Sequence, residues 1–174
     1  IFARLEPGGG GAGPSGSLGA WQPGPDLPRP ISNHRMLAVL GRVYVFGGSG
    51  ESAFIPDVYY AQVQTGGSLG AWARAADMPF PGGSTSLAAV SIGEYIYVGG
   101  GENADCTVHR QVFYAKACAS GVCHPDTGSP TDPWKATSPL PLGVSRLDAV
   151  AVEECLHVYA PGGNTAGCAT SVQN

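Results

Sequence analysis

The stretch "RVYVFGG", residues Arg42–Gly48, decides the fold because variants of it occur twice more. "YIYVGGG" occupies Tyr95–Gly101 and "LHVYAPGG" occupies Leu156–Gly163. Each run is short, rich in Val, Ile, Tyr and Phe, and ends in paired glycines, which is typical of a β-strand that stops at a close turn. Repetition of one pattern along a chain predicts an architecture built from copies of one unit.

Further strands are expected on both sides of each run. Alternating apolar segments precede the runs at Met36–Leu40, Leu87–Ile92 and Leu147–Val152. Gly41 and Gly93 then lie where a tight hairpin needs a positive φ. A third strand follows at "DVYYAQV" (Asp57–Val63) and "QVFYAKA" (Gln111–Ala117), and Ile1–Leu5 shows the same pattern through Phe2 and Ala3.

A tryptophan marks the start of a fourth strand. "GSLGAW" occurs at Gly16–Trp21 and again at Gly67–Trp72, and Trp134 follows in the third copy without the hexapeptide. A proline lies seven residues after each tryptophan, at Pro28, Pro79 and Pro141. The segment between the third strand and the tryptophan differs from unit to unit and is interpreted as a loop, for example "EPGGGGAGPSG" at residues 6–16. Each unit is therefore predicted to be a four-stranded antiparallel meander.

This pattern resembles the kelch repeat, on features that recur in phase over the whole chain. They are the paired glycines Gly47-Gly48, Gly100-Gly101 and Gly162-Gly163, the aromatic pairs Tyr59-Tyr60 and Phe113-Tyr114, and Trp72 or Trp134 after them. "SLGAW" is similar to a linker of bacterial kelch-type proteins. The resemblance implies an all-β propeller like the central domain of galactose oxidase, with one blade per unit.

The blades divide the chain as one propeller segment. Residues 1–28 would supply two strands of a first blade, 29–79 a second blade, 80–141 a third, and 142–174 two strands of a last blade. Propellers typically have four to eight blades, so we expect these three blades' worth not to close a ring alone. The expected partners are other blades, from the same longer chain or from a second chain.

The recurrent residues have a structural role in this interpretation. The paired glycines let the backbone turn where blades crowd the axis. Trp21, Trp72 and Trp134 are each expected to bury on the order of 200 Å² between neighbouring blades.

Candidate binding residues come from loops that a propeller presents on one face. They are Arg29, His34, Arg35, Arg146 and Asp148 before or at the first strands, and Glu51, Glu102 and Asp105 after the second strands. The resemblance implies a non-catalytic interaction or structural module for protein or glycan binding, with no cofactor, metal or catalytic residue assigned. The alternative is the scaffold portion of a galactose-oxidase-like oxidase or a glycosidase whose catalytic residues lie outside this chain.

The five cysteines allow three interpretations. Disulfides Cys118–Cys123 and Cys155–Cys168 would leave Cys106 alone; the thiols could instead be free. A metal site from Cys106, His109, Cys118, Cys123 and His124 is the third, although its spacing is not a standard zinc pattern. Disulfides would favour an extracellular or cell-surface location.

The composition excludes several classes of protein. The formal charge is −4, which gives no electrostatic case for nucleic-acid binding. Apolar stretches run for only a few residues, so no membrane span is expected. An apolar fraction of 43% argues against disorder despite 27 glycines and 15 prolines.

Overall fold

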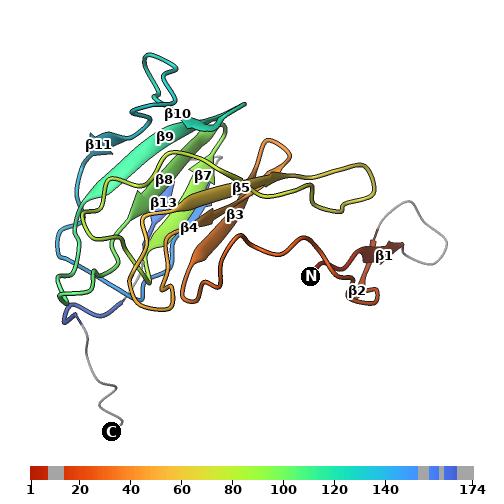
Figure 1. Ribbon diagram of the computed structural model, residues 1–174, viewed down its shortest axis with the longest axis horizontal. Helices are drawn as coiled ribbons and strands as arrows, with labels where there is room; N and C mark the ends of the chain where they lie inside the picture. The colour runs from red at the N-terminus through yellow and green to blue at the C-terminus, as the bar shows by residue number, and fades with distance from the viewer. Residues whose placement is uncertain (8–13, 153–156, 161–162, 168–174) are drawn as a thin grey trace, which may run out of the picture.

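A computed structural model describes residues 1–7, 14–152, 157–160 and 163–167 of the chain (Figure 1). Within those residues the protein is all-β, and every strand pairing is antiparallel. None of the described segments forms a helix able to cross a membrane. The predicted fold class is confirmed at this level.

The first complete repeat is a four-stranded meander. Its strands are β3 (Arg35–Val39), β4 (Arg42–Phe46), β5 (Val58–Gln62) and β6 (Ala73–Arg74), paired in chain order. The β3–β4 turn has positive φ at both Leu40 (48°) and Gly41 (71°). Such a turn matches the twist of the strands it joins, and it confirms the prediction for Gly41.

The second complete repeat is a five-stranded sheet. It contains β7 (Ala88–Ile92), β8 (Tyr95–Gly99), β9 (Val112–Cys118), β10 (Gly121–Cys123) and β11 (Lys135–Thr137). The outer edge of β9 is shared, because β11 pairs with its first half and β10 with its last three residues. The sequence predicted four of these strands and missed β10.

Two short hairpins flank the larger sheets. β12 (Val150–Val152) pairs with β13 (His157–Tyr159), as predicted. β1 (Leu5–Pro7) pairs with β2 (Pro14–Leu18), where a loop was predicted, and this hairpin stands apart from the larger sheets in Figure 1. The predicted strand Ile1–Leu5 pairs at two of its positions. Phe2 and Gln22 exchange backbone hydrogen bonds of 3.0 and 2.7 Å, and Leu5, the first residue of β1, pairs with Leu18.

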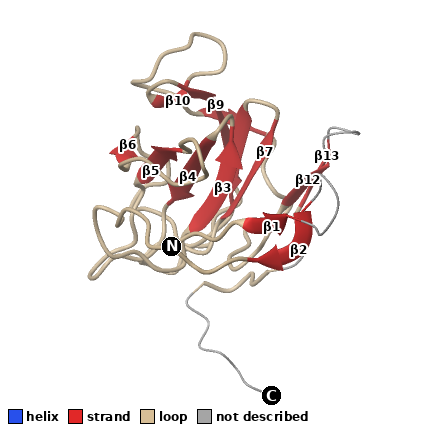
Figure 2. Cartoon of the chain, turned by 90° about the vertical axis from the view of Figure 1, so that its right-hand side faces the viewer, coloured by secondary structure: helices blue, strands red, loops and turns tan. Residues whose placement is uncertain are grey.

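Successive repeats lie side by side through their first strands. β3 contacts β7, and β7 contacts β12 (Figure 2). The turns before these strands are joined by a backbone ladder, in which Ser86 N–H donates to Asn33 O (3.1 Å) and Arg146 N–H donates to Ser86 O (2.9 Å). These three residues share a positive φ of 52–55°. Among the described residues the sheets do not close on themselves.

The main core lies between the two larger sheets. Tyr44 and Phe46 of β4 and Ile96 and Val98 of β8 are completely buried. The Trp134 ring packs edge-on against Phe46, with centroids 6.4 Å apart. Burying one such side chain contributes roughly 1.5–3 kcal/mol, so this interface holds the repeats together.

The paired glycines lie where neighbouring segments meet closely. A Cβ added at Gly48 would lie 2.5 Å from Ser32 O, and one at Gly100 would lie 2.7 Å from Val144 O. Both glycines also have positive φ, as do Gly47, Gly101 and Gly163. Any side chain there would be strained and would clash with backbone. Gly162 lies outside the described residues.

The three recurrent tryptophans differ in burial. Trp134 is 8% exposed, while Trp21 is 61% exposed. Trp72 is half-buried, and its indole N–H donates to Pro25 O at 3.0 Å. The expectation that each tryptophan is buried was therefore wrong for Trp21.

The cysteines follow the disulfide interpretation in part. Cys118 and Cys123 are bonded across the β9–β10 hairpin, as predicted. Cys106, which the predicted pairing left alone, is also disulfide-bonded. Disulfide sulfurs cannot act as thiolate ligands, so the alternative metal interpretation loses three of its five candidate ligands. Cys155 and Cys168 lie outside the described residues.

Candidate functional site

A hollow of about 630 Å³ lies where the turns of successive repeats meet. We call it the inter-repeat pocket. Four predicted binding residues line it, namely His34, Arg35, Glu102 and Arg146. Asn33 and Ser86 of the backbone ladder, together with Ser49, Phe54 and Thr85, complete its wall. These side chains are far apart in the sequence. They meet because they come from the turns of successive repeats, which lie side by side.

Arg35 ties three repeats together beside the pocket. Its Nε donates to Leu87 O at 2.7 Å, and its terminal nitrogen donates to Leu147 O. Leu87 and Leu147 follow the ladder residues Ser86 and Arg146, so the guanidinium reaches the same turn of the next two repeats. Arg35 also lies 3.7 Å from the exposed carboxylate of Asp148.

Glu102 is the buried acid of the pocket. Its side chain is 6% exposed and lies 3.7 Å from the Arg146 guanidinium. Ser145 Oγ donates to Glu102 Oε2 at 3.3 Å. The Glu102 backbone also exchanges hydrogen bonds of 3.0 and 3.1 Å with Thr85. A buried carboxylate is tolerated only with partners of this kind, so Glu102 is a fixed acceptor in the wall.

Of the other predicted binding residues, Asp148 does not line the pocket but pairs with Arg35 beside it, and the remaining three lie outside the pocket wall. Glu51 borders a separate, shallower hollow of about 260 Å³ beside Ser32. Asp105 is an exposed turn residue, and hydrogen bonds from Thr107 lower the pKa of its carboxyl. Arg29 belongs to a different group of charges, described next.

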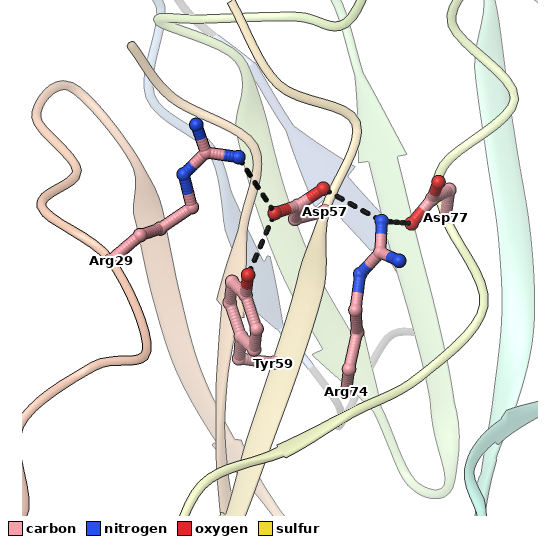
Figure 3. Close-up of polar contacts among 5 residues, drawn as sticks. All are labelled: Arg29, Asp57, Tyr59, Arg74 and Asp77. Atoms are coloured by element: carbon pink, nitrogen blue, oxygen red, sulfur yellow. Dashed lines mark hydrogen bonds and ion pairs between the residues drawn. The ribbon is translucent and has the colours of Figure 1, made fainter. Parts of the chain in front are cut away.

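This second group surrounds Asp57 at the start of β5 and is shown in Figure 3. We call it the Asp57 cluster. Tyr59 Oη donates to Asp57 Oδ2 (2.7 Å), Arg74 donates to Asp57 Oδ1 (2.9 Å), and Arg29 lies 3.6 Å from Asp57 Oδ2. Arg74 also pairs with Asp77 at 2.7 Å. Asp57 is therefore enclosed by donors on both carboxylate oxygens.

The electrostatics of Asp57 follow from this arrangement. Burial alone would raise the pKa of Asp57, but the hydrogen bonds from Tyr59 and Arg74 and the charges of both arginines outweigh it, and the pKa is lowered. Burial and the adjacent carboxylate raise the pKa of the Tyr59 phenol. Both carboxylate oxygens of Asp57 are used by side chains of the protein itself. The Asp57 cluster is therefore suited to holding together β5, β6 and the segment before β3 that carries Arg29.

Sequence reasoning missed five residues of the pocket wall, namely Asn33, Ser49, Phe54, Thr85 and Ser86. A signal was present for Ser49, because it follows Gly47-Gly48 as the chosen residue Glu102 follows Gly100-Gly101. Phe54 carried no such signal, since its loop has no counterpart of the same length in the next repeat. The Asp57 cluster was missed except for Arg29, because Asp57 corresponds to Gln111 in the second repeat.

Comparison with known proteins assigns no relative: no family model matches the chain, and no curated protein matches it.

Proposed function

We propose that this chain is a segment of a kelch-type β-propeller that acts as a non-catalytic binding module, presenting the inter-repeat pocket to a protein or glycan. Three in-phase repeats whose first strands are neighbours support the propeller. The crowding at the paired glycines supports it as well. A further unit would then pack against Trp72 as the second repeat's Trp134 packs against Phe46.

The observation that carries the binding role is the pocket itself. A hollow of about 630 Å³ lies within the size range of ligand sites, and side chains from successive repeats converge on it. Its arginines and acids are engaged with one another at 3.7 Å, an arrangement suited to recognition more than to proton transfer.

A disulfide supports a role outside the reducing cytosol. Cys118–Cys123 joins the two strands of the β9–β10 hairpin, and such bonds persist in oxidising compartments. This supports our proposal that the module acts at the cell surface or in the extracellular space.

The test is to fill the pocket and measure what binding remains. Ser49→Trp puts an indole into the hollow, whereas Thr65→Trp adds the same ring at an exposed turn at the opposite end of β5. Both variants and the wild type would be applied to arrays of glycans and of secreted proteins. We expect Ser49→Trp to bind its ligands with an affinity at least about tenfold lower than the wild type, and Thr65→Trp to bind them with unchanged affinity. Equal binding by both variants would refute the proposal, and oxidation or hydrolysis of a bound glycan would favour the enzyme scaffold.

A further inference from the structure

The charges around the inter-repeat pocket cancel. Arg146 pairs with Glu102 and Arg35 pairs with Asp148, each at 3.7 Å, which gives two positive and two negative side chains. A charged ligand would have to compete with these pairs for its counter-charge. A neutral ligand leaves both pairs in place.

The uncharged part of the wall offers both donors and acceptors. Ser49 Oγ and Thr85 Oγ1 form a hydroxyl pair at 3.0 Å, and Asn33 adds an exposed amide. A hydroxyl group donates one hydrogen bond and accepts up to two. A ligand that carries many hydroxyls can therefore satisfy such a mixed wall, whereas a ligand limited to donors or to acceptors leaves part of it unpaired.

Phe54 is the aromatic member of this polar wall. Its ring is half-buried and offers a flat apolar surface with a negative face. A pyranose ring has the matching shape, with hydroxyls at its edge and polarised C–H groups on its face. A protein anchor would instead favour a largely apolar recess that desolvates an aromatic or aliphatic side chain, which this wall does not provide.

We infer that the inter-repeat pocket binds a neutral sugar, with the ring stacked on Phe54 and the hydroxyls bonded to the side chains of Ser49, Thr85 and Asn33. This inference rests on the proposed function and narrows its ligand to a neutral glycan. Size agrees, because a hollow of about 630 Å³ lies within the range of small-molecule sites.

The experiment titrates the protein with each probe, and binding is monitored by saturation-transfer NMR and by calorimetry. The neutral probes are maltopentaose, cellopentaose, mannopentaose and chitopentaose; the charged probe is hexagalacturonate; the protein-like probe is a library of short neutral peptides. We expect at least one neutral oligosaccharide to bind, with an affinity that 1 M NaCl leaves unchanged, because screening acts on charges. Phe54→Ala should weaken it by at least about fivefold.

Two further variants guard against a folding artefact. Ser49→Ala changes one hydroxyl and should weaken the sugar about threefold to tenfold, while Thr65→Ala at the distant turn should have no effect. Thermal unfolding of each variant establishes that it is folded. Failure of all neutral oligosaccharides to bind would overturn the inference. The ligand in the pocket could instead be hexagalacturonate, a peptide or a secreted protein. If one of these binds and Ser49→Trp abolishes that binding, the inference is wrong and the proposed function stands. If Ser49→Trp changes no ligand, both fail.

Discussion

The two larger sheets secure their outer edges by different chemistry. In the first, β6 has two residues, and Arg74 on it bonds to the buried Asp57 at the start of β5. In the second, β11 has three residues, Lys135 on it pairs with Asp126 at 2.6 Å, and a disulfide closes the neighbouring β9–β10 hairpin. Both sheets keep the same register in their first three strands. The repeat therefore specifies the frame, and each copy stabilises its short last strand independently.

The largest effect is expected from removing the aromatic contact between the two sheets, in which Trp134 packs on Phe46. Trp134→Ala deletes the indole that packs on Phe46 and should cost about 3–5 kcal/mol of unfolding free energy, measured by chemical denaturation. Trp21→Ala is the matched control and should cost less than about 0.5 kcal/mol, because Trp21 is 61% exposed. Similar losses for the two variants would show that the indole does not join the sheets.

Removing the covalent tie tests the second sheet alone. Cys118→Ala with Cys123→Ala opens a bond that spans five residues, and loop-closure entropy gives a loss of about 2 kcal/mol. The double variant is preferable to a reducing agent, which would also attack the disulfide at Cys106. Denaturation of the variant without added reductant is the measurement. An unchanged midpoint would mean that β11 and Lys135–Asp126 secure this edge without the disulfide.

The charged tie of the first sheet should be weaker. Asp57→Asn removes the negative charge between two arginines that are 43% and 54% exposed, and solvent screening limits the loss to about 1–2 kcal/mol. Asp77→Asn, at the exposed end of the same cluster, should cost under about 0.5 kcal/mol. Since the pKa of Asp57 is lowered, the wild-type advantage should persist above pH 3.8 and disappear as the pH falls through the folded-state value. A constant difference down to pH 2 would contradict this assignment.

Acid should loosen the second repeat before the first. His109 in the β8–β9 loop is 6% exposed, and burial lowers its pKa below 6.5. The unfolded chain therefore takes up a proton on acidification before the folded chain does, so stability should fall as the pH drops below 6.5. The slope stays under about 1.4 kcal/mol per pH unit. His109→Gln should flatten the stability profile below pH 6.5, and a profile unchanged by that substitution would exclude His109.

The first strands of each repeat could be predicted from the sequence because local sequence features determine them. Alternating apolar residues and the positive φ required at Gly41 fix β3 and β4 within a few positions. β10 was missed because its three residues lie in a stretch dominated by cysteines, Ser and Pro. The first strand was assigned over Ile1–Leu5, and there Phe2 and Leu5 keep the pairing of the repeat, since Leu5 pairs with Leu18 as Val63 pairs with Leu69.

The sites were harder to predict because side chains far apart in the sequence form them, in the pocket from different repeats and in the Asp57 cluster from different strands of one repeat. The pattern identified Arg35 and Glu102 as candidates, yet nothing in it indicates that Arg35 reaches the carbonyls of Leu87 and Leu147. Asp57 and Arg74 are separated by 17 positions and have no counterparts in the second repeat. Such contacts depend on the packing of the strands, which no single repeat encodes.

The hydrogen-bond ladder through Asn33, Ser86 and Arg146 uses main-chain atoms only. Three chemically unrelated residues occupy equivalent rungs, so the rungs do not depend on what their side chains are. Evolution can consequently exchange these groups one by one, provided the newcomer tolerates a left-handed backbone, which β-branched residues resist. The side chains at these rungs and the backbone architecture can thereby change separately, and a library randomised at these rungs would vary the proposed binding surface without rebuilding the scaffold.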